Sequence, residues 1–164
     1  MTNLEKKQLI IKIKNDYNTD SLESLDEWED KIIDANMLVI GDFKLHLENK
    51  GLAKKTISHH INNIDMFANY YLTTYDYCGT IFDGYKNFND FFGYWFITKC
   101  LFASENSMKS LISSLKKFYT FLYEEKYINK DEMDDAIFSL NEGKEGWLDD
   151  LNTYITNPSD YYSI

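Results

Sequence analysis

The sequence predicts an all-α protein that folds as a single domain. Two stretches show the pattern most clearly, Ala53–Leu72 and Ser107–Tyr127, where apolar residues recur every three or four positions as on one face of a helix. Only 1 proline and 7 glycines interrupt the 164 residues, and no run of alternating β-branched residues suggests a strand. A chain of this length can bury one core of its own.

Further helices are predicted in chain order by the same spacing and by local cap signals. Gly51 stands where a glycine ends a helix, and Gly41 inside that helix suggests a close helix crossing. The longest irregular stretch is expected at Thr73–Asn89. For Leu4–Tyr17 a short amphipathic helix is expected, with a strand as the alternative. The other predicted elements are a helix that begins within Asn18–Asp30, Asn36–Lys50, a buried helix Asn89–Phe102, short helices around Met133–Leu140 and Trp147–Ile155, and a tail Asn157–Ile164.

Charge is distributed unevenly along a chain of net charge −10. Residues 51–117 carry seven lysines against five acids, whereas residues 118–164 carry three lysines against eleven acids. The chain has no arginine, so the bidentate guanidinium contacts that favour phosphate and guanine cannot form. A local lysine patch can still bind phosphates, although the acidic total repels DNA at long range.

No motif in the sequence predicts catalysis, a metal site or a cofactor. Cys78 and Cys100 are isolated and are expected to be buried apolar residues, and the adjacent His59 and His60 point about 100° apart on a helix, so they cannot ligate one metal together. We expect the aromatic residues between Tyr70 and Phe96 to anchor the core and loops; a base-stacking platform is the alternative. A secretion signal and a membrane span are not predicted, which favours the cytoplasm.

Two runs resemble the N-terminal core-binding (SAM-like) domain of phage integrases, the tyrosine recombinases: GLAKKTISHHINNIDMFANYYL and SENSMKSLISSLKKFYTFLYEEKYI. The resemblance covers residues 36–128, with 1–35 as an N-terminal helical extension and 129–164 as acidic C-terminal helices and tail. The matching positions are Phe43 to Leu47, Gly51, Leu52, Thr56, Ile57, Phe67, Leu72, Ser107, Leu111, Leu115, Phe118, Tyr119, Phe121 and Leu122.

The resemblance implies an orthogonal bundle of helices that holds one side of duplex DNA. Lysines would neutralise phosphates, serines would hydrogen-bond them, and Asn62 could address an adenine edge. In the family a catalytic domain follows, whose arginines activate a phosphodiester for attack by a tyrosine. Because this chain has no arginine, Tyr161 and Tyr162 are not expected to act as nucleophiles, and we expect no enzyme activity. The implied DNA contacts are Lys54, Lys55, Ser58, His59, Asn62, Lys109, Ser110, Ser113, Lys116 and Lys117.

Three functions therefore stay open. The first is a non-catalytic, DNA-associated protein of mobile-element origin that binds duplex weakly through two helix faces. The second is a protein-interaction module in which the acidic flanks and exposed aromatic residues engage another protein or a second copy. The third, a mimic of DNA, is suggested by charge alone. A continuous basic stripe through the lysines would favour the first, and lysines neutralised by neighbouring carboxylates would favour the second.

Overall fold

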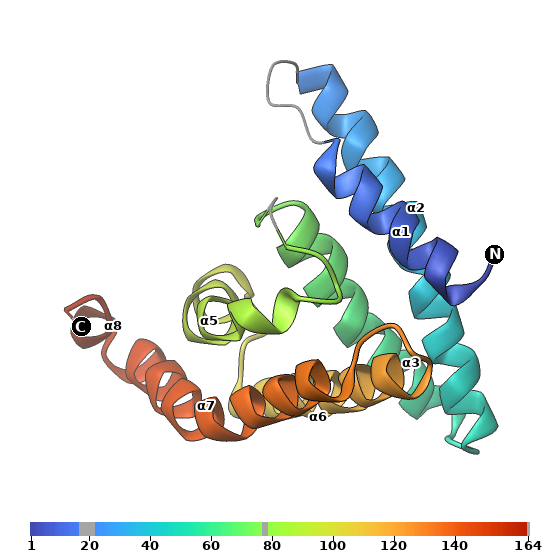
Figure 1. The fold of residues 1–164 in the computed structure, drawn as a ribbon. Coiled ribbons are helices and arrows are strands. Elements are labelled where there is room, and N and C mark those ends of the chain that lie inside the picture. The colour runs from blue at the N-terminus through green and yellow to red at the C-terminus, as the bar shows by residue number, and fades with distance from the viewer. Residues whose placement is uncertain (17–21, 77–78, 164) are drawn as a thin grey trace.

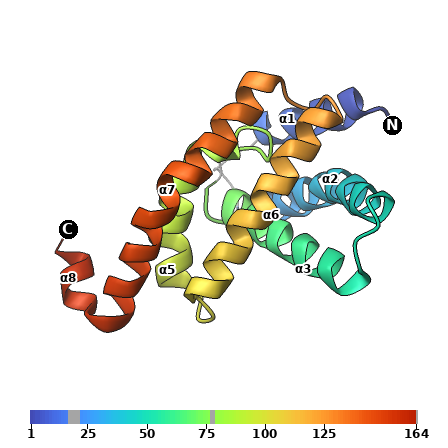
Figure 2. The same ribbon diagram turned by 90° about the horizontal axis from the view of Figure 1, so that it is seen from below.

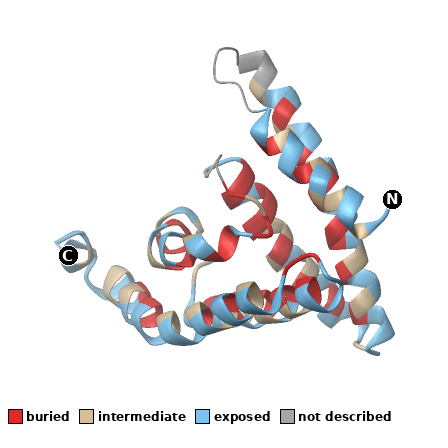
Figure 3. Ribbon diagram, in the orientation of Figure 1, coloured by how far each residue is buried: buried red, intermediate tan, exposed pale blue. Residues whose placement is uncertain are grey.

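The computed structural model describes residues 1–16, 22–76 and 79–163, with the side chains of residues 22–24 left aside, and every regular element within them is helical. The prediction of an all-α protein is therefore confirmed for the described part of the chain. The ribbon in Figure 3, coloured by burial, places buried residues where the helices face one another, while exposed residues follow the outer surfaces and the C-terminal end.

Helices α1 (Asn3–Asn15) and α2 (Leu22–Asn49) lie side by side as an antiparallel pair (Figure 1). Thr2 caps α1 in a capping box with Glu5. The sequence suggested two helices where the structure has the single helix α2, so that division is wrong. Trp28, Ile32 and Val39 are all buried on one continuous stripe, and Asn36, at the expected boundary, donates through its amide to Asn69 Oδ1 at 2.9 Å.

Gly51 ends α2 as predicted. Its φ is +78°, its N–H donates to the Glu48 carbonyl at 2.9 Å, and the Leu52 N–H donates to the Leu47 carbonyl at 3.3 Å. Gly41, in contrast, is exposed, and a Cβ there would meet nothing within 4 Å. The predicted close crossing at Gly41 is therefore wrong, because α2 turns that face to solvent.

Helix α3 (Lys54–Asp65) continues without a break into the π-helix η1 (Met66–Thr73). A second helical segment packs against η1 and consists of η2 (Gly84–Asn87), α4 (Phe88–Asp90), the π-helix η3 (Phe91–Trp95) and α5 (Phe96–Lys99). Phe67 and Phe91 meet with ring centroids 5.0 Å apart.

This aromatic packing confirms the core assignment for the residues that are buried. The deep burial predicted for a helix Asn89–Phe102 holds for most side chains between Phe91 and Ile97, but the helix ends at Lys99, and Leu101 and Phe102 are exposed. Tyr70, Tyr75 and Tyr94 are exposed, whereas Tyr77 and Cys78 lie outside the described residues. Cys100 is half-buried and free, and burial raises the pKa of its thiol to about 11.

Helix α6 (Glu105–Glu124) lies between α3 on one side and α7 (Lys130–Thr156) on the other (Figure 2). A capping box of Asn129 and Glu132 opens α7 as the sequence indicated. The two short helices predicted around Met133–Leu140 and Trp147–Ile155 are one helix, so that division is wrong, and the Trp147 indole packs onto Gly143 inside it. The predicted tail contains the short helix α8 (Pro158–Tyr162).

Candidate nucleic-acid interface

The crossing of α3 and α6 brings together side chains from both predicted contact helices. His59 Nε2 lies 2.5 Å from Ser110 Oγ, and His60 Nδ1 lies 2.7 Å from Ser114 Oγ. The amide of Asn63 donates to both serine hydroxyls, at 3.1 Å and 2.9 Å. We call these five residues the polar seam, and it fixes α3 and α6 in one register. Ser110, a predicted phosphate ligand, therefore has a hydroxyl that already contacts two side chains.

His60 and Ser114 are the buried members of the polar seam. The hydrogen bonds are satisfied when the Ser114 hydroxyl donates to Nδ1 of His60 and accepts from Asn63, which requires that nitrogen to carry no proton. Burial, followed by the positive charge of nearby Lys117 and by His59, lowers the pKa of His60 below its usual value. The contact between His60 and Ser114 is therefore a neutral hydrogen bond at pH 7.

Lysines flank the polar seam on both helices. Lys54, Lys55 and Lys117 are exposed, and Lys116 is half-buried. Within the described part of the chain none of these four has a carboxylate oxygen within 4.0 Å. We call them the basic face. Lys109, by contrast, pairs with Glu105 at 2.7 Å, so the predicted stripe of five lysines has one neutralised member.

The remaining predicted contacts lie along α3 and α6 in positions open to solvent. Ser58, His59, Asn62 and Ser113 are exposed. A shallow hollow of about 510 Å³ runs along α3 and is lined by Lys55, Thr56, Ser58, His59, His60 and Asn62. The structure thus gathers most of the predicted residues from α3 around one depression.

A second depression, which we call the basic pocket, lies where the end of α2 meets α6. It encloses about 260 Å³ and is lined by His46, Leu47, Lys50, Leu52, Lys116, Lys117 and Thr120. Of these residues, only Lys116 and Lys117 are among the DNA contacts predicted from the sequence. The i, i+4 spacing of His46 with Lys50, and of Lys116 with Thr120, places each pair on one helix face and is the signal that could have identified them.

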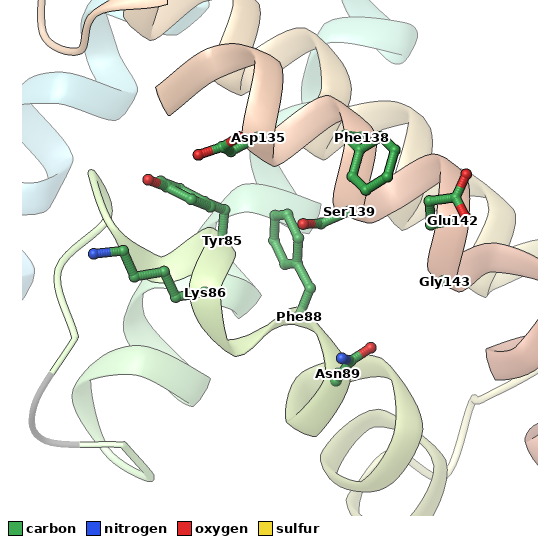
Figure 4. A pocket seen from close by; sticks show the side chains of 9 residues that line it. All are labelled: Tyr85, Lys86, Phe88, Asn89, Asp135, Phe138, Ser139, Glu142 and Gly143. Atoms are coloured by element: carbon green, nitrogen blue, oxygen red, sulfur yellow. The ribbon is translucent and has the colours of Figure 1, made fainter. Parts of the chain in front are cut away.

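A wider groove lies on another part of the molecule, between α7 and the η2–α4 segment. It encloses about 670 Å³, and Figure 4 shows Tyr85 and Phe88 across from Asp135, Phe138 and Ser139 of α7, whereas the side chains of Lys86 and Glu142 point away. Phe138 is 64% exposed at its edge, and Asp135 and Glu142 line it from α7. This groove is acidic and aromatic, unlike the basic face. Its lining consists of Tyr85, Lys86, Phe88, Asn89, Asp135, Phe138, Ser139, Glu142 and Gly143.

In the part of the chain that the structure describes, no group of three or more His, Cys, Asp or Glu side chains could hold a metal ion. The hydroxyl of Tyr161 donates to the Gly93 carbonyl at 2.6 Å, and burial raises the pKa of that hydroxyl.

Across the same described residues, none of the helices has the length and apolar character that crossing a membrane requires. Comparison with protein-family models, curated proteins and solved structures finds no match for the chain.

Proposed function

We propose that this protein binds duplex DNA weakly and without catalysis, through the basic face of α3 and α6. The observation that carries the proposal is the basic face itself: four lysines that have no carboxylate partner among the described residues, next to exposed serine and asparagine side chains, in a chain of net charge −10. Phosphate binding requires lysines that no carboxylate neutralises, and in an acidic protein such lysines stand out. The resemblance to the integrase core-binding domain supports the same two helices.

The chemistry of the basic face suits phosphates better than bases. Lysine is a point charge without the planar fork that reads guanine bidentately, so binding should depend little on sequence. Ser58 and Ser113 can donate to phosphate oxygens, and Asn62 is the only proposed base contact. We infer a cytoplasmic protein of mobile-element origin that associates with DNA but does not cut or join it.

Fluorescence anisotropy with a short labelled duplex at low and moderate salt tests the proposal. Four phosphate contacts predict that log K falls with log salt at a slope of about −3 to −4. A variant with Lys54, Lys55, Lys116 and Lys117 changed to Glu should lose binding. The control changes four exposed lysines elsewhere, Lys12, Lys31, Lys44 and Lys86, to Glu, which alters net charge equally and should retain most of the affinity. Absence of binding at low salt, or equal loss in both variants, would contradict the proposal.

A second candidate function, a protein-interaction module, is favoured by the acidic groove of Figure 4 with its exposed Phe138. Its partner would present a positively charged surface, and the basic face of a second copy is one that the chain itself supplies. Sedimentation velocity at low salt tests this contact: association that disappears in both an Asp135→Asn, Glu142→Gln variant and the basic-face variant supports it. A monomer at every salt concentration would reject self-association.

A further inference from the structure

We infer that the basic pocket is a binding site for a phosphoryl group, and that the carboxylate of Glu124 competes with that group for the cationic side chains of the pocket. The pocket joins three lysines and a histidine from two helices that are distant in sequence. The carboxylate of Glu124 lies close to two of its lining residues, His46 and Lys50, so a bound phosphate would compete with it for them. This inference rests on the proposed function for one source of the phosphoryl group, the DNA backbone.

The fold builds the pocket from three separate segments. The last turns of α2 supply His46, Leu47 and Lys50, the turn after Gly51 supplies Leu52, and the middle of α6 supplies Lys116, Lys117 and Thr120. The positive φ of Gly51 turns the chain so that Leu52 can reach this position. The pocket is therefore a product of the α2–α6 packing rather than a cluster on one helix.

The charges around the pocket are unbalanced. Glu124 Oε2 lies 3.4 Å from His46 Nε2 and 3.8 Å from Lys50 Nζ, and no other carboxylate of the described residues is within 4.0 Å of a lining cation. The lining thus carries three lysines against one neighbouring carboxylate, which pairs with Lys50 alone among them. The Glu124 side chain is 41% exposed, so it can rotate away at little cost. An incoming dianion would replace one negative charge by two.

The shape and donors of the pocket fit a phosphoryl group with one ester substituent. Its volume of about 260 Å³ is below that of sites for drug-sized ligands. Lysine ammonium groups donate to phosphate oxygens as point charges, and the two leucines provide an apolar floor. Thr120 Oγ1 donates to the Lys116 carbonyl at 2.8 Å, so this hydroxyl holds the wall and does not serve as a phosphate donor.

Two-dimensional amide NMR with inorganic phosphate as the probe, at constant ionic strength set with chloride, tests the inference. Phosphate should shift the amide signals of residues 46–52 and 116–124 together. Glu124→Gln should tighten phosphate binding about three-fold, since it removes an exposed ion pair that competes with the ligand, and Lys50→Gln and Lys116→Gln should weaken it. Glu125→Gln is the matched control: it has the same charge change one residue away and no ion pair, and should leave affinity nearly unchanged.

The two sources of the phosphoryl group are separated by repeating the Glu124 and Glu125 variants with duplex DNA. Tighter binding of both phosphate and DNA in Glu124→Gln alone assigns the backbone as the ligand. Tighter phosphate binding with no DNA binding assigns a free phosphorylated compound, and would reject the proposed function while the inference stands. Equal effects of the two glutamate variants, or phosphate shifts confined to other residues, would overturn the inference even if DNA binds through α3.

Discussion

Two glycines of α7 should respond to alanine in opposite directions. A Cβ on Gly143 would lie 2.5 Å from Cε2 of Trp147 and closer still to Cζ2 and Cη2, whereas a Cβ on Gly146 would meet nothing within 4 Å. The indole cannot simply move aside. It is only 4% exposed, its ring stacks on Phe92 with centroids 4.6 Å apart, and its Nε1 donates to Asn89 Oδ1 at 3.1 Å.

The magnitudes follow from these contacts. Overpacking a core costs about 1–3 kcal/mol, and the short contacts at Gly143 place this clash near about 3 kcal/mol. Because alanine has a higher helix propensity than glycine, the substitution itself stabilises the helix by about 1 kcal/mol at either position. Gly143→Ala should therefore lower the free energy of unfolding by about 2 kcal/mol, and Gly146→Ala should raise it by about 1 kcal/mol. For a domain of this size these changes correspond to a Tm lower by about 4–8 °C and higher by about 2–4 °C.

Thermal and urea denaturation followed by circular dichroism measure both changes, and Trp147→Phe in each background is the control. The smaller ring should relieve most of the clash, so Gly143→Ala should cost less in the Trp147→Phe background than in the chain that keeps Trp147. If both glycine variants shift Tm in the same direction, or if the ring change has no effect on the cost, the proposed packing of Trp147 on Gly143 is refuted.

Three further predictions concern contacts elsewhere. The pKa of His60 is lower in the folded chain than in the unfolded chain, so the unfolded chain binds the proton first as pH falls below about 6.5. The polar seam therefore contributes its full stabilisation above that pH and less below it. His60→Gln should reduce the loss of Tm between about pH 7.5 and 5.5. Asn129→Ala removes the cap of α7 and should cost about 1 kcal/mol in urea denaturation. Tyr119→Phe leaves the buried Ile81 carbonyl without its 2.9 Å donor and should cost about 1–3 kcal/mol.

Each of these three has a contradicting outcome. If Tm depends on pH in the same way in His60→Gln as in the unchanged chain, His60 does not contribute to the loss of stability in acid. Asn129→Asp should retain the cap and most of the stability, so an equal loss in the aspartate and alanine variants would argue against capping. Tyr85→Phe, a neighbouring tyrosine with no hydroxyl bond described, is the control for Tyr119→Phe, and equal costs would show that the Ile81 contact contributes nothing.

Periodicity and caps were sufficient to predict the helices on either side of the polar seam. The stripe of α6, the glycine after α2 and the Asn129 cap are local signals, and the structure contains each of them. Helix continuity in α7 was missed because its apolar residues fall into two groups, around Met133–Leu140 and Trp147–Ile155. Gly143 lies between them, and the Trp147 ring fills the space that a side chain there would occupy, which only the folded chain shows.

The candidate site was partly predictable for the same reason. The lysines of α3 and α6 were identified because each helix shows a polar face in its own sequence. His46 and Lys50 belong to a different helix and come close to Lys116 only through the packing of α2 on α6. Nothing in a local pattern measures such a distance, so the basic pocket and the carboxylate of Glu124 beside it required the structure.

The π-helix that follows α3 constrains how long this part of the chain can be. Each helical residue turns the chain by about 100°, and a π-turn holds one more residue than an α-turn. Deleting one residue from Met66–Thr73 would restore ordinary α-helix, but would rotate everything before it relative to everything after it. Either Lys54 and Lys55 would leave their side of the molecule, or Tyr71 would leave the core. This segment should therefore accept exchanges among apolar residues more readily than a single insertion or deletion.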